Sequence, residues 1–466
     1  MKINFITKWH LFRPHQDFRV MKQTICIFLV IFLAANATAQ QMKIIRDSVY
    51  SDNLKEERQI EVELPDDYDP ASGKKYEVIY VTDGEWNNDI VAHMQRFVQI
   101  QFVPPCIVVS MKNMGLRDRD FTPSRLQGNP RSGGADKFLA FMKTELMPYI
   151  EKKYPARADN RVYVGSSLAG LFGMYVFLRD PLLFQSYLIS DPAMWWGDGM
   201  LLKETGDKLA GMSNVHASLY ITGREGAAFR EMGVYQLDSI FKAKAPASLH
   251  WKVTPYAGET HNSMIFKTVF DGLKFTWAGY TTDQPRYHPM TGIVLKDKSF
   301  PLYIWPDERS DWHYTTDGTV PTAASPRITG KLDLTITEQF VIKSVCVRDE
   351  YSDTVRGTFK VGNTLPAVPL PGKVKPGGLD TLQGQLSGGI KIDTDGYYIF
   401  FVNTEDSVNV SIGHVAFDKQ SFVVPLQKGY YPLKVTYKGS APGIEWLVPN
   451  SPDSGPVPAT VLYHYK

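Results

Sequence analysis

The feature that most limits the fold of this sequence is the junction between an apolar strand and an apolar helix, in RVYVGSSLAGLFGMYVFLRDP (residues 161–181). A strand predicted up to Val164 passes into a helix predicted from Leu168, with only a glycine and two serines between them. So abrupt a turn lifts the side chain at its apex clear of the sheet, beside a helix N-terminus. The same turn crowds the backbone, so it requires small residues two positions before and two positions after the apex.

Ser167 is the candidate apex, because Gly165 and Ala169 stand at those two positions. Ser166 lacks such a frame, since bulky residues stand two positions away on both sides. A serine hydroxyl becomes a nucleophile when a base lies within hydrogen-bond reach and N–H donors hold the oxyanion. The backbone N–H of Leu168 is a candidate for one such donor. A tightly packed junction without chemistry is the alternative interpretation of the motif.

This strand–helix junction lies in a region, residues 40–280, in which predicted strands and helices alternate. Strands are predicted in RQIEVELPDDY, YEVIYVTDG, PPCIVVSM, RVYVG, SYLIS, SLYITG and HWKVTPY. The segment ADKFLAFMKTELMPYIEKKY carries apolar side chains at helical spacing, and Pro148 is expected to kink that helix. The alternation predicts an α/β fold with a mostly parallel sheet covered by helices on both faces.

The sequence changes beyond this region to short β runs and turns, which predicts two all-β sandwich domains. We expect the first at residues 283–362, a linker rich in proline and glycine at 363–378, and the second at 379–466. Cys106 and Cys346 fall in different predicted domains, so no disulfide framework is expected.

The N-terminal sequence MKQTICIFLVIFLAANATAQ, which begins at Met21, is typical of a signal peptide. It combines one lysine, an apolar run too short for a typical membrane span, and the small-x-small pattern that ends at Ala39. We therefore expect a signal peptide within residues 1–39 and export to the periplasm or the cell exterior. No membrane span is expected after cleavage, and an uncleaved membrane anchor is the alternative.

Composition narrows the classes of partner. The 51 Lys and Arg residues nearly balance the 49 Asp and Glu residues, giving a net charge of +2, so no nucleic-acid partner is expected. The scattered histidines lack the spacing of metal ligands, and no phosphate-cradling loop is evident, so neither a metal nor another cofactor is expected.

The partners of Ser167 are expected further along the chain, in the order acid and then histidine. His261 follows the last predicted strand of the α/β region on a turn-rich segment, YAGETHNSM. Glu225 follows the preceding strand, and Asp191, which follows the strand before that, is the fallback acid. Either carboxylate is able to hold the imidazole through its second nitrogen. A solvated loop histidine and a surface carboxylate are the alternatives.

The second oxyanion donor is expected in the loop after the strand YEVIYV. A backbone N–H near Glu85 or Trp86 is the candidate. Asp83 lies in the same loop, but its place early in the chain favours a structural role.

Several aromatic and basic residues are candidates for the lining of a substrate pocket. Trp86, Trp195 and Trp196 are candidates for contact with flat sugars or phenolic acids, and core packing is the alternative. Arg117 and Arg119 lie on a loop after a strand and are candidates for binding an acidic group of the substrate. Structural ion pairs are the equally weighted alternative for both arginines.

Residues 43–280 resemble the putative-esterase branch of the α/β-hydrolases, which includes esterase D, siderophore (enterochelin-type) esterases and feruloyl or acetyl xylan esterases. The resemblance is carried by VIYVTDGEW, RDRDFTPSR, FMKTELMPYIEKKYPA, VYVGSSLAGLFGMYVFLRDPLLFQSYLIS, AMWW and ETHNSM. It implies Ser167 as nucleophile, His261 as base and Glu225 as acid. The chain departs from the usual Gly-His-Ser-x-Gly-Gly at Ser166 and Ala169, and its Ser-Asp-Pro replaces the usual Ser-Pro-Ser.

Residues 283–362 are similar to the immunoglobulin-like C-terminal domain of chitobiase-type enzymes, through HYTTDGTVPTAASPRITGKLDLT and FVIKSVCVRDEYSD. Residues 370–466 resemble a shortened protective-antigen-type β-sandwich, often a carbohydrate-binding module, through GGIKIDTDGYYIFFVNTEDSVNVSIG, LQKGYYPLKVTYKG and IEWLVP. Together the resemblances imply an exported serine esterase for carbohydrate-linked esters, acetyl or feruloyl, with polysaccharide as a partner of the β domains. A siderophore esterase and a non-catalytic glycan-binding protein on a hydrolase scaffold are the alternatives.

Overall fold

The computed structural model describes residues 43–99, 102–281, 287–304, 311–335, 339–369, 372, 374–404 and 406–465. The expected signal peptide and its cleavage site lie outside these residues. No helix in the described ranges is long and apolar enough to cross a membrane. The chain forms two compact units. The first holds the residues through His93 with Pro105–Ala217 and Glu225–Leu249, and the second holds Met94–Pro104, Ser218–Arg224 and the chain from His250 onward.

The sheet of the first unit has the strand order β1-β2-β4-β3-β5-β6. Its strands are β1 (Lys43–Ser51), β2 (Glu56–Leu64), β3 (Tyr76–Val81), β4 (Cys106–Met111), β5 (Ala156–Ser166) and β6 (Ser186–Ser190). The first two strands run antiparallel to their neighbours, and the other four are parallel to one another. Every position of β3 and β4 is buried, as expected for strands covered on both faces.

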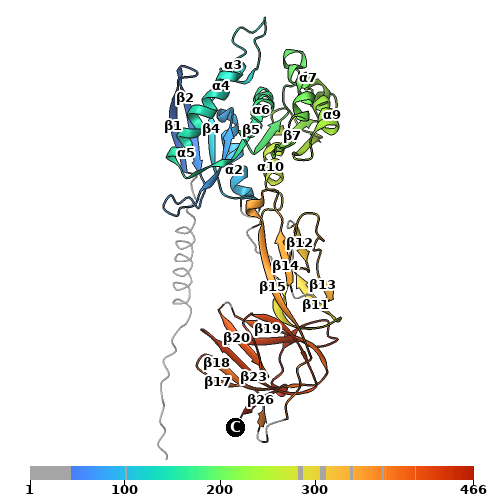
Figure 1. The fold of residues 1–466 in the computed structure, drawn as a ribbon. Helices are drawn as coiled ribbons and strands as arrows, with labels where there is room; N and C mark the ends of the chain where they lie inside the picture. The colour runs from blue at the N-terminus through green and yellow to red at the C-terminus, as the bar shows by residue number, and fades with distance from the viewer. Residues whose placement is uncertain are drawn as a thin grey trace, which may run out of the picture. The chain divides into compact units, whose positions relative to one another are not determined.

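Helices follow the strands of this unit (Figure 1). They are α2 (Gly84–Val98, which continues into the second unit), α3 (Arg117–Phe121), α4 (Ala135–Phe141), α5 (Met147–Lys153), α6 (Leu168–Arg179), α7 (Trp196–Ala210), α8 (Ala227–Glu231) and α9 (Val234–Lys244). Of these, α5 and α6 pack directly on the sheet. The helix expected to kink at Pro148 contains a π-helical turn at Met142–Leu146 and continues as α5. Pro148 lies in the first turn of α5, where its missing N–H is tolerated.

The second unit contains a parallel pair of strands, β7 (Ser218–Arg224) and β8 (His250–Tyr256). Helix α10 (Met264–Thr276) packs on β7, and the hydroxyl oxygens of Thr222 and Thr268 lie 2.6 Å apart between them. With the first unit, these elements complete the predicted alternation of strands and helices. The expected fold class, an α/β region with a mostly parallel sheet followed by all-β regions, is confirmed.

The remainder of the second unit is all β. The first β region holds β9 (Tyr287–His288), β10 (Thr291–Leu295), β11 (Ser299–Ile304), β12 (Trp312–Thr315), β13 (Leu332–Thr335), β14 (Gln339–Ser344) and β15 (Asp353–Gly362). The second holds β16 (Val374–Pro376), β17 (Asp380–Leu382), β18 (Gln385–Ile392), β19 (Gly396–Asn403), β20 (Val408–Ile412), β21 (Val415–Phe417), β22 (Ser421–Leu426), β23 (Gly429–Tyr437), β24 (Gly443–Leu447), β25 (Gly455–Pro456) and β26 (Leu462–Tyr465).

One sheet crosses both β regions, in the order β12-β14-β15-β10-β22-β19-β24-β25. Strand β10 joins them, because it pairs in parallel with β15 on one side and with β22 on the other. Ile399, Val423 and Leu447 of the second region are buried in the same core as the side chains of the first. The two β regions are therefore joined by continuous hydrogen bonding and by shared packing.

The segment expected to be a linker, 363–378, packs onto the second β region. Leu365 is buried, and its N–H donates to the carbonyl of Pro425 at 2.8 Å. The Val368 N–H donates to the carbonyl of Tyr430 at 2.9 Å, and β16 pairs with β26. Because these backbone groups bond within the sandwich, the described part of this segment belongs to it and is not a free connector.

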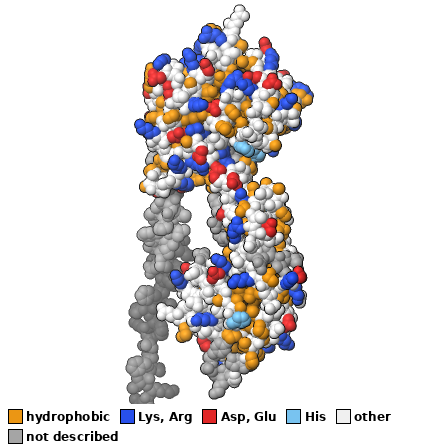
Figure 2. Space-filling model, viewed as in Figure 1, with side chains coloured by type: hydrophobic (Ala, Val, Ile, Leu, Met, Phe, Trp, Pro, Cys, Tyr) orange, Lys and Arg blue, Asp and Glu red, His pale blue; other side chains and the backbone are white. Residues whose placement is uncertain are grey.

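Basic and acidic side chains intermingle on the face of the protein that Figure 2 displays. This pattern agrees with the near balance of the two kinds of charge in the sequence.

Candidate active site

Ser167 occupies the sharp turn between β5 and α6. Its backbone angles, φ 61° and ψ −117°, lie outside the regions that residues with a side chain ordinarily adopt. The Ser167 N–H donates to the carbonyl of Ser190 at 2.9 Å, and its carbonyl accepts from the N–H groups of Leu171 (2.9 Å) and Ala193 (3.0 Å). The strained residue is thus held by α6 and by the segment after β6.

Gly165 is required by the packing of this turn. A Cβ at that position would lie 2.5 Å from the hydroxyl oxygen of Tyr163 and 2.6 Å from the carbonyl oxygen of Ala169. The Tyr163 hydroxyl donates to that same carbonyl at 2.6 Å, which fixes both groups. The turn accommodates the methyl group of Ala169, a departure from the usual family pattern, in a fully buried position.

The N-terminus of α6 directs backbone N–H groups toward the space beside Ser167. Leu168 is the first residue of this twelve-residue helix, so its N–H has no acceptor within the helix. The helix dipole also favours negative charge at this end. Both features support Leu168 as an oxyanion donor.

The turn from β3 to α2 lies next to the Ser167 turn, because β3 and β5 are neighbours with Val81 opposite Val164. The Trp86 N–H donates to the carbonyl of Asp83 at 2.9 Å, within the first turn of α2. This bond occupies the N–H of Trp86, one of the two candidates for the second oxyanion donor.

The side chain of Glu85 fixes this turn from a third element. Its carboxylate accepts the backbone N–H groups of Asn113 (3.2 Å) and Met114 (2.9 Å), which follow β4. Two charge-assisted bonds of this kind hold the loop after β4 and the start of α2 in one arrangement.

Arg117 bridges the two turns. Its Nε donates to Asp83 Oδ1 at 2.9 Å, and its Nη2 donates to the carbonyl of Ser166 at 3.4 Å. Asp83 is buried with φ 54°. Burial raises the pKa of Asp83 to about 6, although the adjacent guanidinium acts in the opposite direction. Arg117 therefore forms an ion pair, which was one of its two predicted roles. Its guanidinium carbon also lies 5.5 Å from the centre of the Trp86 ring.

Arg119 is likewise held in an ion-pair network. Its guanidinium bonds to Glu56 at 2.6 and 2.9 Å and to Asp120 at 2.9 Å. Asp120 also accepts the side-chain N–H of Asn113 at 2.9 Å, and Asn113 Oδ1 accepts the backbone N–H of Asp83 at 3.2 Å. These bonds give Arg119 a structural role: it supports the loop that carries the oxyanion candidates.

The segment after β6 carries the fallback acid and two tryptophans. Asp191 is fully buried with φ 40°. Trp196 is 4% exposed and packs in the core, whereas Trp195 is 49% exposed, with 5.9 Å between the two ring centres. Trp86 is 53% exposed. The exposed pair, Trp86 and Trp195, remains the candidate for substrate contact.

His261 lies in the second unit, on the loop between β8 and α10. The Thr260 N–H donates to Ser263 Oγ at 2.9 Å, and the Ser263 N–H donates to Thr260 Oγ1 at 3.0 Å. The Ser263 hydroxyl donates to Glu259 Oε2 at 2.6 Å. Reciprocal bonds of this kind define the start of a helix, so the loop that carries His261 is braced on both sides of it.

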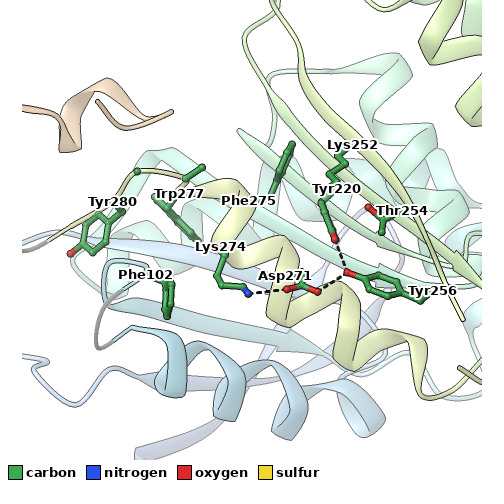
Figure 3. A pocket seen from close by; sticks show the side chains of 12 residues that line it. Phe102, Tyr220, Lys252, Thr254, Tyr256, Asp271, Lys274, Phe275, Trp277 and Tyr280 are labelled. Atoms are coloured by element: carbon green, nitrogen blue, oxygen red, sulfur yellow. Dashed lines mark hydrogen bonds and ion pairs between the residues drawn. The ribbon is translucent and has the colours of Figure 1, made fainter. Parts of the chain in front are cut away.

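A chain of side-chain bonds joins β7, β8 and α10, and Figure 3 shows it. The hydroxyl oxygens of Tyr220 and Tyr256 lie 2.7 Å apart, and Tyr256 donates to Asp271 Oδ2 at 2.6 Å. Lys274 pairs with Asp271 at 2.9 Å. Tyr256 is the last residue of β8, so this chain anchors the strand end from which the His261 loop departs. A cavity of about 470 Å³, lined by the side chains drawn in Figure 3, adjoins it.

Glu225 directly follows Arg224, the last residue of β7. Arg224 lies opposite Tyr256, so the loops after β7 and β8 leave the parallel pair at the same edge. The chain position of Glu225 fits the acid role, although its side chain is exposed and that of Asp191 is buried. In the part of the chain that the structure describes, no three His, Cys, Asp or Glu residues are grouped to hold a metal ion.

Several known proteins are similar in sequence to this domain. Residues 51–221 match the family model described as "Putative esterase". Ferri-bacillibactin esterase BesA of Bacillus subtilis (strain 168) is 32% identical over 159 residues, which are 29% of this chain and 53% of the relative. The siderophore enterobactin esterase of Emericella nidulans is 26% identical over 172 residues, which are 35% of this chain and 52% of that protein.

The crystal structure of the BES protein from Bacillus cereus is similar with a TM-score of 0.47 and 25% identity, covering 50% of this chain and 94% of that one. The chain spans about half the length of the two curated relatives described above. Two β regions follow the matched domain, as the sequence led us to expect. The resemblance of the α/β domain to the putative-esterase family is thereby confirmed for residues 51–221.

Proposed function

We propose that this protein is a serine esterase with Ser167 as nucleophile, His261 as general base and Glu225 as the acid that orients the imidazole. The strained backbone of Ser167, at the N-terminus of α6, carries the proposal. This backbone conformation places a hydroxyl beside helical N–H groups, where a developing oxyanion is stabilised.

The proposed reaction proceeds through an acyl-enzyme. His261 accepts the Ser167 hydroxyl proton as the serine oxygen attacks the ester carbonyl carbon, and the N–H groups of Leu168 and Glu85 hold the resulting oxyanion. The protonated imidazole then gives its proton to the departing alcohol oxygen. Water, deprotonated by His261, attacks the acyl-enzyme, releases the carboxylic acid and restores the Ser167 hydroxyl.

Asp191 is the second candidate for the acid. It is fully buried, and its neighbour Ser190 accepts the backbone N–H of Ser167. A buried carboxylate stabilises an imidazolium more strongly than an exposed one does. Glu225 is preferred because it follows β7, and the histidine follows the adjacent strand β8.

For the substrate, we propose an exported enzyme that hydrolyses carbohydrate-linked esters, acetyl or feruloyl. The signal-like N-terminal sequence and the two appended β domains support this choice. A siderophore ester is the second candidate, and the names of both curated relatives favour it. The exposed rings of Trp86 and Trp195 suit a flat substrate group in either case.

A substrate panel tests this proposal. The chain from Gln40 is assayed on acetylated xylan, methyl ferulate and a ferric siderophore ester, with Ser167→Ala as the blank. Higher kcat/KM on xylan or ferulate supports the carbohydrate-linked class, and higher kcat/KM on the siderophore supports the second candidate. Equal rates for wild type and blank on every ester would overturn the esterase proposal itself.

A further inference from the structure

One buried side chain spans the turn that presents Ser167. Tyr163 lies on β5, four residues before Ser167, and its hydroxyl donates to the carbonyl of Ala169 at 2.6 Å. Ala169 is the second residue of α6 and comes two residues after Ser167. The bond therefore joins the strand that enters the turn to the helix that leaves it, with the strained residue between them.

The tyrosine ring occupies space that two glycines leave open. A Cβ at Gly165 would lie 2.5 Å from the hydroxyl oxygen of Tyr163, and a Cβ at Gly173 would lie 2.5 Å from Cε1 of the same ring. The ring also packs on Phe172 and Phe184, with 6.0 and 5.4 Å between the ring centres. Tyr163 is fully buried, so its hydroxyl is held in one place by packing on several sides.

The same hydroxyl lies beside the turn that follows β3. Thr82 Oγ1 is 3.3 Å from the hydroxyl oxygen of Tyr163. Thr82 donates its hydroxyl (2.9 Å) and its N–H (3.1 Å) to the carbonyl of Val164. Thr82 comes three residues before Glu85, and Ala169 directly follows Leu168. Tyr163 therefore contacts both segments that carry candidate oxyanion donors.

The Tyr163 hydroxyl is suited to donate a hydrogen bond and not to act as a base. Burial raises its pKa above the ordinary value of 10. Of the neighbouring charges, Asp83 raises this pKa further and Arg117 lowers it. The hydroxyl stays protonated near neutral pH, and its one proton is directed at the carbonyl of Ala169.

We propose that Tyr163 is a positioning residue for the Ser167 turn, whose hydroxyl holds the N-terminus of α6, and with it the Leu168 N–H, in place beside the nucleophile. The inference rests on the proposed esterase function, because it concerns the same site. Without this hydroxyl, the strand and the helix on either side of Ser167 lose the bond that joins them. Small displacements of reacting and oxyanion-binding groups lower the rate of the chemical step.

The neighbouring strand supplies a matched control. Tyr187 of β6 lies directly opposite Tyr163 in the sheet, and it is also fully buried. Its hydroxyl bonds to the carbonyls of Asp180 (3.2 Å) and Pro181 (3.3 Å), just beyond the C-terminus of α6. Phenylalanine at either position removes one hydroxyl from a buried ring. The two variants therefore lose a bond at opposite ends of the same helix.

Hydrolysis of p-nitrophenyl acetate tests the inference on the chain from Gln40. Wild type, Tyr163→Phe and Tyr187→Phe are compared, with Ser167→Ala as the blank, and thermal unfolding confirms that each protein is folded. Both phenylalanine variants should lower Tm by about 2–4 °C. Tyr163→Phe should lower kcat by about ten- to a hundredfold with little change in KM, whereas Tyr187→Phe should retain the wild-type kcat. The ratio of kcat between Tyr163→Phe and wild type should stay constant from about pH 6 to about pH 9.

Three results would overturn the inference while leaving the proposed function intact. The first is a wild-type kcat in Tyr163→Phe. The second is an equal loss of kcat in Tyr187→Phe, which would show that any buried hydroxyl of this domain has the same effect. The third is a kcat ratio that changes with pH, which would show that the hydroxyl exchanges a proton during the reaction. Turnover that survives in Ser167→Ala would instead refute the proposed function, and this inference with it.

Discussion

Arg117 and Asp83 form an ion pair, with 2.9 Å between Nε and Oδ1, and the same guanidinium reaches the carbonyl of Ser166. The pair therefore connects the turn that follows β3 with the turn that presents the candidate nucleophile. Arg117, a candidate for substrate binding or for a structural ion pair, thus contacts both loops of the proposed oxyanion site.

Arg117→Lys should lower kcat by about ten- to a hundredfold with a smaller change in KM, because small displacements of catalytic groups are costly. Lysine keeps the charge but loses the planar fork that spans Asp83 and Ser166. Arg131→Lys, which changes an exposed arginine of the same segment, is the control. A change of KM alone would show that Arg117 binds substrate directly.

The pKa of Asp83, raised by burial to about 6 from an ordinary 3.8, predicts a pH dependence of stability. The folded state binds the proton more tightly than the unfolded state, so the contribution is complete below 3.8 and is lost as pH rises through about 6. Between about pH 5 and about pH 7, the free energy of unfolding of wild type should fall relative to Asp83→Asn by on the order of 1 kcal/mol. Urea unfolding of both proteins at the two pH values measures this difference. A difference that is constant or rises would contradict the shift.

Gly165→Ala should destabilise the α/β domain by about 2–4 kcal/mol, because the new methyl has no space beside Tyr163 and Ala169. Gly128→Ala is the matched control, since a Cβ there meets no atom within 4 Å. Thermal unfolding followed by circular dichroism compares the two variants. Equal melting temperatures would show that the turn relaxes and that its small residues are not required by packing.

Glu225→Gln and Asp191→Asn distinguish the two acid candidates. If Glu225 orients His261, its amide variant should lose about 10³- to 10⁴-fold in kcat, as replacement of a triad acid does. Asp191→Asn should then retain most of the activity, and so should Glu231→Gln, which changes an exposed residue of the neighbouring helix α8. The reverse ranking of the first two variants would assign the acid to Asp191.

Local patterns in the sequence predicted much of the fold. Strands β3 and β4 are buried at every position, so their sequences are continuous, mostly apolar runs that predict buried strands. The small residues around Ser167 predicted the sharp turn directly. The turn-rich segment of His261 was also evident. The bonds between Thr260 and Ser263 that brace this segment are less evident, although the spacing of the two residues offers a signal.

Long-range partners account for what the sequence did not show. Asp83 lies 34 residues before Arg117, and only the pairing of β3, β4 and β5 brings them together. Leu365, within the predicted linker, is buried and bonds to Pro425, a residue on a strand distant in sequence that the local pattern does not reveal. Adjacent tryptophans, Trp195 and Trp196, differ in exposure through the path of the backbone after β6, which composition does not reveal.

Hydrolysis of p-nitrophenyl acetate by wild type, Ser166→Ala and Ser167→Ala, each from Gln40, tests whether Ser167 is the nucleophile. We expect turnover by wild type, near-normal turnover by Ser166→Ala, and a loss of several orders of magnitude in Ser167→Ala. A fluorophosphonate should label the first two proteins on the peptide that contains Ser167 and leave the third unlabelled. Equal activity and labelling of all three would contradict Ser167 as the nucleophile.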